Sequence, residues 1–266
     1  MNARPILRLL AAILLLTAPL WGSYGLWRFA PFKPQKVLLI DYTVPFDNFK
    51  EHAGIMWLLN HYKYPSADGG AWIPDKSYTG YHPDDRAHPR RLESVDLTHY
   101  DWVYVNDTYG VYVDDLYGIP ERKSHMDYSK VVFGGLSLGD AGALKRFTDG
   151  GGNVVLEFNS IEDPTDEQTR QLVEPMMGMH WTGWVCRAFA NLYDENDVPR
   201  WVPRLYREQY GSDDMPHEPT LLFVNRQSRM LLLSDPQMIN VAPRILMTEA
   251  GRQRFPSADS GAPYYY

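Results

Sequence analysis

The sequence predicts an α/β fold with a central, mostly parallel sheet, preceded by one N-terminal transmembrane helix. Three observations support this class. Apolar runs of strand length recur at residues 37–40, 102–105 and 154–158. Segments with helical spacing of apolar residues accompany these runs, and one uncharged N-terminal stretch is long enough to cross a membrane. Alternating strands and helices are typical of a parallel sheet covered by helices.

The composition fits a folded protein of one large domain, or of one domain with an extension, because 44% of the 266 residues are hydrophobic. The net charge is −7, although residues 1–35 contain only basic charges, so the folded portion is the more acidic part. An acidic surface repels phosphates, which argues against nucleic acid as a partner. Cys186 is the single cysteine, and the loop histidines are irregularly spaced. We therefore expect no disulfide, no metal and no cofactor.

Residues 9–27 are uncharged and follow Arg4 and Arg8. Arginines before an apolar stretch favour an N-terminus in the cytoplasm. We expect residues 1–28 to anchor the chain in the cell membrane by a single pass, with the main domain on the extracytoplasmic side. A cleaved signal peptide is the alternative, although no A-x-A site follows Leu20. Residues 29–35, which include two prolines, predict a short stiff linker.

The first predicted strand, residues 37–40, ends at Asp41 and Tyr42. A helix from about Asp47 to His61 should follow it. The apolar face of that helix is expected to comprise Phe49, Ala53, Met56 and Leu59. Residues 64–94 have no sustained period, and a connection of this length is usually a binding insertion or a lid. The second strand, residues 102–105, ends at Asn106 and Asp107.

The segment 136–160 predicts a helix, a tight turn and a strand. Ser137 and Asp140 form a capping-box pattern at the start of the helix, and Gly150–Gly152 end it. The apolar run at 154–158 predicts an interior strand of a parallel sheet, so a ligand site is expected beyond its carboxyl end. Glu157 lies within this run, and a carboxylate in a buried strand needs a partner or a function.

The remainder of the chain changes in pattern. A helix should begin at Pro164 and Thr165, with Gln168 as its capping partner. Later elements are predicted as a strand at 181–189, a helix at 199–210, a hairpin of 220–224 with 230–233, and a strand at 245–247. We assign residues 36–185 to the α/β domain and residues 186–266 to an α+β extension. The ending on Tyr264–Tyr266 suggests an incomplete extension, since termini are usually polar.

Several features together resemble a known superfamily. These features are the apolar first strand, a strand introduced by Tyr100 and Asp101, and a helix ending in Phe147 and the glycine run before the third strand. Over residues 36–176 this order resembles the class I glutamine amidotransferase-like superfamily, most closely its trehalose-utilisation-like branch. The resemblance implies a flavodoxin-like three-layer sandwich.

The resemblance also implies, for catalytic members, a nucleophilic cysteine on a sharp turn between a strand and a helix. Here the turn after Phe158 carries Asn159 and Ser160, with no Gly-x-Cys-x-Gly pattern. Cys186 lies a whole helix further on, where we expect a buried, inert thiol. The chain is thus expected to be a pseudoenzyme, a superfamily member without the catalytic cysteine.

The candidate site is the sheet edge at which the three strands end. Its predicted binding residues are Asp41, Tyr42, Asn106, Asp107, Glu157, Asn159 and Ser160. The structural alternative is that Asp41 and Asp107 cap loops and that Asn159 turns the chain. The catalytic candidates, should the protein be an enzyme, are Glu157, Asp41 and Asp107.

Three functional interpretations follow. The preferred one is a binding or scaffold module of the cell envelope that takes a saccharide or a protein ligand, because it explains the absent nucleophile and the Tyr- and Trp-rich loops. The alternative is a hydrolase, with glycans as a candidate substrate, that would use the strand-end carboxylates as acid and base. A serine hydrolase built on Ser160 with His180 or His217 lacks the glycine-flanked elbow.

Overall fold

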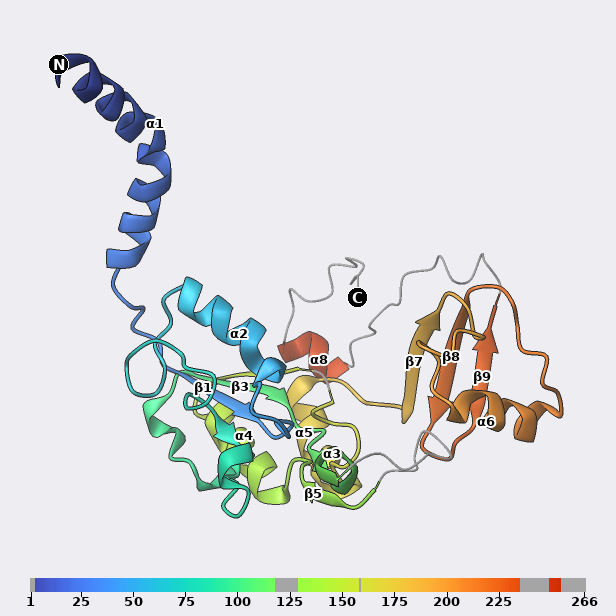
Figure 1. Ribbon diagram of the computed structural model, residues 1–266. Helices are drawn as coiled ribbons and strands as arrows, with labels where there is room; N and C mark the ends of the chain where they lie inside the picture. Colours follow the sequence, from blue (N-terminus) through green and yellow to red (C-terminus); the bar gives the residue numbers. More distant parts are fainter. Residues whose placement is uncertain (1–2, 118–128, 158, 235–248, 255–266) are drawn as a thin grey trace.

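The computed structural model describes residues 3–117, 129–157, 159–234 and 249–254 (Figure 1). These residues form an α/β domain around a parallel sheet, a smaller antiparallel sheet with its own helix, and a long N-terminal helix. The strand expected at 245–247 and the final tyrosines lie outside the described residues, as does Phe158.

Four parallel strands form the central sheet, in the order β2-β1-β3-β6. They are β1 (Val37–Asp41), β2 (Thr79–Gly80), β3 (Trp102–Asp107) and β6 (Asn153–Leu156). The prediction that β1, β3 and β6 are neighbouring parallel strands is confirmed. The two-residue strand β2 is missing from the prediction, because it lies in the irregular connection after Tyr64 and is too short to show a period.

Helices cover both faces of this sheet. They are α2 (Lys50–His61), α4 (Leu138–Asp149) and α5 (Glu167–Met177). Side chains alternate along the strands, so β1 and β3 each contribute to two apolar cores. Leu39 shares a core with Met56 of α2, whereas Ile40 shares the other core with Leu144 of α4 and Val173 of α5. The sheet is therefore packed between α2 on one side and α4 with α5 on the other.

β6 lies at the edge of the sheet, which corrects the prediction of an interior strand. Within the described residues, β3 is its single strand partner. Asn153 is exposed and Val154–Leu156 are half-buried, whereas all five residues of β1 are buried. An apolar run indicates that a strand is at least partly covered, but it does not distinguish an edge position from an interior one.

The ends of α4 follow the predicted signals. Ser137 Oγ accepts a hydrogen bond from the Asp140 N–H, and the Asp140 carboxylate accepts one from the Ser137 N–H, which makes the predicted capping box. Gly151 has a φ of 92° directly after the helix. This is a left-handed conformation that glycine adopts without a steric penalty.

α5 starts later than predicted. Its N-cap is Asp166, whose carboxylate accepts from the Thr169 N–H, and Thr165 lies before the helix. The hydroxyl of Thr165 instead accepts from the Leu136 N–H. Thr165 and Asp166 are neighbours, and either could cap a helix. Thr165 bonds to Leu136 in another segment, so Asp166 is the cap and the helix begins after it.

A short ribbon continues from the carboxyl end of β3. It consists of β4 (Val111–Tyr112), α3 (Val113–Tyr117) and β5 (Val131–Phe133). Gly110 and Gly134 bring the ribbon backbone against itself. A Cβ on Gly110 would lie 2.3 Å from the Phe133 carbonyl oxygen, and one on Gly134 would lie 2.7 Å from Gly110 Cα. This contact admits no side chain at either position.

An antiparallel sheet follows the α/β domain in the chain. It contains β7 (Trp184–Phe189), β8 (Thr220–Asn225) and β9 (Met230–Leu233), with α6 (Trp201–Tyr210) packed on it. The predicted hairpin is present, since Val224 pairs with Met230. This sheet has its own core, in which Val202 of α6 contacts the group around Leu222.

An ion-pair network joins the two sheets. Arg226, in the turn between β8 and β9, donates from Nε and Nη2 to the two carboxylate oxygens of Asp163, at 3.1 and 2.9 Å. The buried Arg170 of α5 places its Nη1 3.8 Å from the same carboxylate. A bidentate pair fixes orientation as well as distance, so Asp163 orients the hairpin against the α/β domain.

α8 (Glu249–Arg254) lies beside α5.

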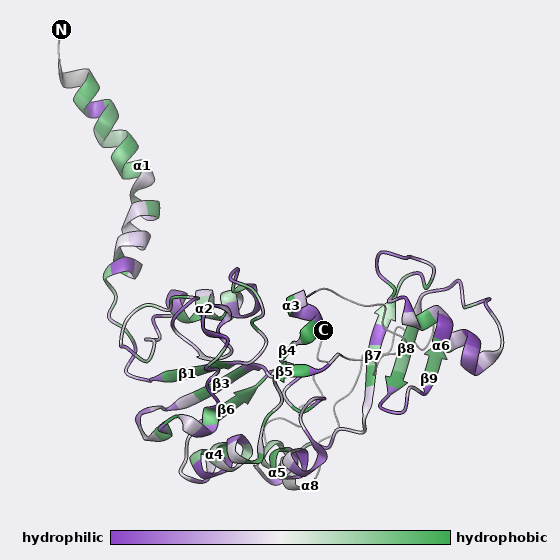
Figure 2. Cartoon of the chain, turned by 60° about the horizontal axis from the view of Figure 1, so that its bottom comes forward, coloured by the Kyte–Doolittle hydropathy of each residue, from purple (hydrophilic) through white to green (hydrophobic). Residues whose placement is uncertain are grey.

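The long helix α1 (Ala3–Phe29) extends away from the α/β domain (Figures 1 and 2). Its segment Ile6–Phe29 is long and apolar enough to cross a membrane and is not buried against the rest of the protein. The hydroxyls of Thr17 and Ser23 donate to carbonyls one turn earlier, so these polar groups are satisfied inside the helix. The helix thus has the properties of a membrane anchor or a signal segment.

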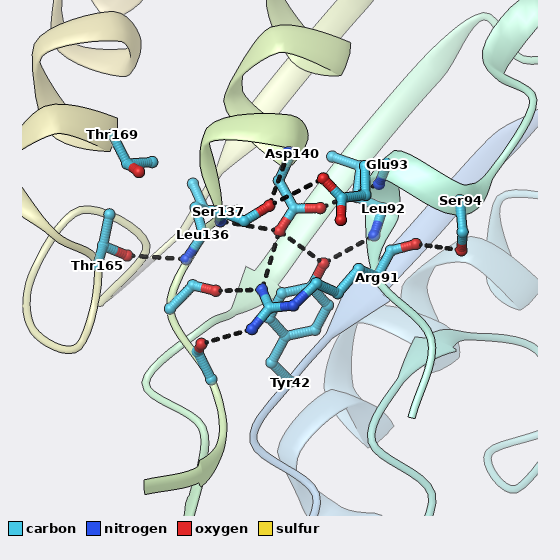
Figure 3. Close-up of polar contacts among 12 residues, drawn as sticks. Tyr42, Arg91, Leu92, Glu93, Ser94, Leu136, Ser137, Asp140, Thr165 and Thr169 are labelled. Carbon is cyan, nitrogen blue, oxygen red and sulfur yellow. Dashed lines mark hydrogen bonds and ion pairs between the residues drawn. The ribbon is translucent and has the colours of Figure 1, made fainter. Parts of the chain in front are cut away.

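The Asp140 carboxylate is the centre of a buried polar network (Figure 3). Four donors from three parts of the chain reach it: the Tyr42 hydroxyl at 3.2 Å, Arg91 Nη1 at 3.1 Å, the Glu93 N–H at 3.0 Å and the Ser137 N–H at 3.0 Å. Burial and the Asp140 charge both raise the pKa of Tyr42, so its hydroxyl stays protonated and donates.

Arg91 extends this network from the irregular connection to the ribbon. Its guanidinium donates to the carbonyls of Gly134 and Gly135, and it lies 4.8 Å from the centre of the Phe133 ring. The connection of residues 64–94 is therefore held against the sheet at its far end, rather than forming a free lid.

We predict that Asp140→Ala lowers the free energy of unfolding by about 3 kcal/mol, because it leaves Arg91 and two backbone N–H groups without their acceptor. Asp149→Ala is the matched control on the same helix, since the exposed Asp149 forms a surface pair with Lys145 that should contribute less than about 1 kcal/mol. Urea unfolding of the full chain in detergent, followed by tryptophan fluorescence, measures both. Equal losses in the two variants would show that the network is not a major source of stability.

Candidate functional site

Three predicted site residues meet at the carboxyl edge of the central sheet. Asp41, at the end of β1, pairs in register with Asp107 at the end of β3. Asn106 Nδ2 donates to Asp41 Oδ2 at 3.0 Å. Tyr42 is different, because its ring packs in the core on the α4 and α5 side of the sheet and its hydroxyl belongs to the Asp140 network. Its predicted role in binding at this edge is therefore corrected to a structural one.

His52 of α2 completes the buried part of this edge and was absent from the predicted site. Its Nδ1 lies 2.9 Å from Asp41 Oδ2, and its Nε2 lies 2.9 Å from the Pro74 carbonyl oxygen. The donor and acceptor roles of the two ring nitrogens depend on the imidazole tautomer. Both nitrogens have a polar partner within the protein, so the buried histidine is fully engaged.

The helical period of α2 could have identified His52. The buried residues of α2 are His52, Met56 and Leu59, whereas Ala53, which was expected on the buried face, is exposed. A spacing of four and then three residues is the ordinary spacing of one helix face. The prediction placed Ala53 on that face because alanine is apolar. The face instead carries His52, whose ring can hydrogen-bond to the buried Asp41 carboxylate.

Asp107 and Glu51 are the carboxyl groups of this edge whose pKa values are raised. Burial, together with the nearby Asp41 charge, raises the pKa of Asp107 to about 6. Burial also raises the pKa of Glu51, and its Oε2 atom has no hydrogen-bond partner among the described residues. Asp107 accepts from the Tyr109 N–H at 2.7 Å and remains half-buried. It is thus a partly accessible acid that is able to hold a proton near neutral pH.

The accessible rim of the edge is formed by two loops, which we call the β1 and β3 loops after the strands that they follow. Thr43 Oγ1 accepts from the Gly110 N–H at 2.8 Å, so the two loops contact each other. The side chains of Phe46, Asp47 and Asn48 are exposed next in the chain, and 47% of the Phe46 surface is accessible. The β1 loop therefore presents an aromatic ring, a carboxylate and an amide to solvent.

Glu157 does not have the environment that was predicted. It is exposed after the edge strand β6, and it accepts a hydrogen bond from the Tyr104 hydroxyl. A solvated carboxylate with a partner carries no burial cost, so the argument that it needs a function no longer holds. Asn159 has a φ of 47° and turns the chain, as the structural alternative proposed. Ser160 is buried, and its hydroxyl donates to the Glu157 carbonyl oxygen at 2.5 Å.

The two histidines considered as partners of Ser160 lie elsewhere. His180 Nδ1 is 2.7 Å from the Glu174 carboxylate, and His217 stacks on Tyr193 beside the antiparallel sheet. Neither contact places an imidazole at the Ser160 hydroxyl, which is engaged with backbone. The geometry gives no support to a serine hydrolase.

Cys186 lies in β7 and is exposed, which corrects the prediction of a buried thiol. It projects from a strand rather than from a strand-to-helix turn, and it pairs in register with Phe223. Partial desolvation raises the pKa of the thiol. A raised pKa leaves less of the nucleophilic thiolate at neutral pH, which is compatible with an inert thiol. That Cys186 is inert stays a prediction.

The described residues contain no group of three or more His, Cys, Asp or Glu side chains that could hold a metal ion. A hollow of about 700 Å³ lies at the opposite end of the sheet, between the segment around Tyr100 and the end of α4 at Phe147. Comparisons of the chain with protein-family models, with curated proteins and with solved structures gave no match.

We predict that Asp107 makes the stability of the protein fall as pH rises. Between about pH 4 and pH 6, folded Asp107 holds a proton that the unfolded chain has released, so the free energy of unfolding decreases by about 2 kcal/mol. Asp107→Asn keeps an acceptor for the Tyr109 N–H and should lose most of this decrease. Urea unfolding from pH 4 to pH 8 measures it, with Asp149→Asn as the exposed control. An unchanged pH profile in Asp107→Asn would contradict the assignment.

Proposed function

We propose that the chain is a membrane-anchored binding or scaffold module of the cell envelope, with residues 36–266 on the extracytoplasmic side. Its α/β domain is proposed to be flavodoxin-like and to belong with the class I glutamine amidotransferase-like superfamily, without the catalytic cysteine. The apolar helix α1 supports the anchoring, and the parallel order of β1, β3 and β6 is compatible with that fold. The proposed activity is binding rather than turnover.

One observation carries this proposal: the histidine that contacts Asp41 at the carboxyl edge of the described sheet is sealed from solvent. His52 and Asp41 have no accessible surface, and His52 uses both ring nitrogens within the protein. A general base must reach the proton that it removes, so this pair is not available to a substrate. The contacts of His52 and Asn106 with Asp41 instead hold α2 to the ends of β1 and β3.

The rim itself favours a saccharide as the ligand. An exposed aromatic ring packs against the C–H face of a sugar, while carboxylate and amide groups bind its hydroxyls. Phe46, Asp47, Asn48 and Asp107 supply these groups on two adjoining loops. A protein ligand is the other partner compatible with such a surface.

A hydrolase directed at glycans is the second candidate function. Its support is the raised pKa of Asp107, which lies next to Asp41 and the unpaired Oε2 atom of Glu51. A carboxyl group that retains its proton near neutral pH is suited to act as a general acid on a glycosidic oxygen. In this scheme Glu51 would be the second carboxyl group, in place of Glu157.

We predict that full-length protein in detergent binds a subset of glycans on an array, and that Phe46→Ala weakens this binding about thirtyfold, as expected for a central aromatic contact. Leu172→Ala, at a similarly exposed apolar position of α5, is the control and should bind normally. Parallel assays with generic hydrolase substrates distinguish the candidates. Turnover that disappears in Asp107→Asn would favour the hydrolase, and turnover that disappears in Cys186→Ala would contradict both.

We predict the extracytoplasmic orientation from Arg4 and Arg8 before the apolar stretch. Alkaline phosphatase fused after Gln35 should be active, and green fluorescent protein fused at the same position should stay dark. Bright fluorescence without phosphatase activity would place the domain in the cytoplasm. The basic residues on the other side of the apolar stretch, beginning with Arg28, favour the opposite orientation.

A further inference from the structure

The outward face of α2 is apolar, which is unusual for a helix on the surface of a domain. Residues 52–62 contain no Asp, Glu, Lys or Arg. Trp57, Leu58 and Tyr62 are exposed over 64%, 42% and 56% of their surfaces. A surface helix normally presents charged residues to water, and a continuous exposed apolar face marks a site of membrane or protein contact.

The end of α1 joins this face directly. Trp27 Nε1 donates to the His61 carbonyl oxygen at 2.7 Å, and the ring of His61 stacks between those of Trp27 and Trp57, with centroid distances of 6.2 and 5.3 Å. The Lys33 N–H donates to the Lys63 carbonyl oxygen at 2.7 Å, which ties the linker to the end of α2. α2 lies on the side of the domain from which α1 leaves (Figures 1 and 2).

Basic side chains gather around the same face, although the chain as a whole is acidic. Residues 28–36 and 50–64 contain a single acid, Glu51, against five basic residues: Arg28, Lys33, Lys36, Lys50 and Lys63. Lys63 Nζ lies 4.2 Å from the centre of the Trp27 ring, and Lys33 Nζ lies 4.4 Å from that of Tyr64. Aromatic rings next to ammonium groups are the usual composition of the interface between a bilayer and water.

We propose that this face is a second membrane-binding surface, formed by Phe32, Trp57, Leu58 and Tyr62, which we call the α2 surface. It would lie in the headgroup layer of a bilayer that contains anionic lipid, beside the point where α1 enters, with Lys33 and Lys63 facing lipid phosphates. The proposal rests on the anchoring role of α1 in the proposed function. Continuity with α1 and the local positive charge select a lipid surface over a partner protein.

The test uses single-cysteine variants of the full chain in a Cys186→Ser background, labelled with an environment-sensitive fluorophore. Leu58→Cys reports on the α2 surface and Leu15→Cys reports on α1. Leu172→Cys is the matched control, because Leu58 and Leu172 are exposed over 42% and 41% of their surfaces. The proteins are reconstituted into vesicles of phosphatidylcholine and phosphatidylglycerol that carry a nitroxide quencher either at headgroup depth, to report on position 58, or in the acyl-chain region, to report on position 15.

We expect quenching at positions 15 and 58 and none at position 172. Lys33→Glu with Lys63→Glu should abolish quenching at position 58 and leave it at position 15, since each basic group contributes about fivefold to binding of an anionic surface. Quenching at 15 without quenching at 58 would overturn the α2 surface while leaving the anchor intact, and no quenching at 15 would overturn both. Protection of position 58 in native membranes but not in pure lipid would identify a protein partner instead and would also overturn the proposal.

Discussion

The buried Asp140 carboxylate is the interaction on which the α/β domain depends most. It receives hydrogen bonds from the end of β1, from the connection after β2, and from the start of α4. Each of these segments lies at or beyond the end of a regular element, so the carboxylate joins parts of the chain that regular backbone pairing does not join to one another. A buried charge is tolerated only when its donors are all in place, so these segments are expected to order together rather than one by one. The Gly139 position shows how closely they fit, since a Cβ there would overlap the Glu93 carboxylate.

α2 connects the candidate site with the candidate membrane surface, because its two faces have different tasks. The inner face places His52 against Asp41, and the outer face presents Trp57 and Leu58. The β1 loop that forms the rim lies before the start of α2, whereas Trp27 of α1 contacts its end. A helix of this length separates the two by about 18 Å. If the α2 surface lies on lipid, the rim opens along the membrane, where an envelope ligand would be met from the side.

Local signals in the sequence were sufficient for part of this structure. The strands β1, β3 and β6, the capping box of α4 and the β8–β9 hairpin depend on neighbouring residues, and they are predictable for that reason. The edge position of β6, the short strand β2 and the pairing of His52 with Asp41 depend on contacts between distant segments. Glu157 shows the difference: its apolar neighbours suggest burial, yet the open edge leaves it in water. Asp140 was recognised as a helix cap, while its partnership with Arg91 could not be inferred from spacing.

The contact between Gly110 and Gly134 limits how the candidate site can change. Gly110 lies in the β3 loop and packs backbone against backbone on Gly134, so any side chain at either position would displace the ribbon. Selectivity for a ligand therefore cannot be changed by placing a larger residue at Gly110 or Gly134. Variation has to come from the β1 loop, where Phe46, Asp47 and Asn48 are exposed and bear little of the packing. Related chains that bind different ligands would be expected to keep both glycines and to diverge within those few loop positions.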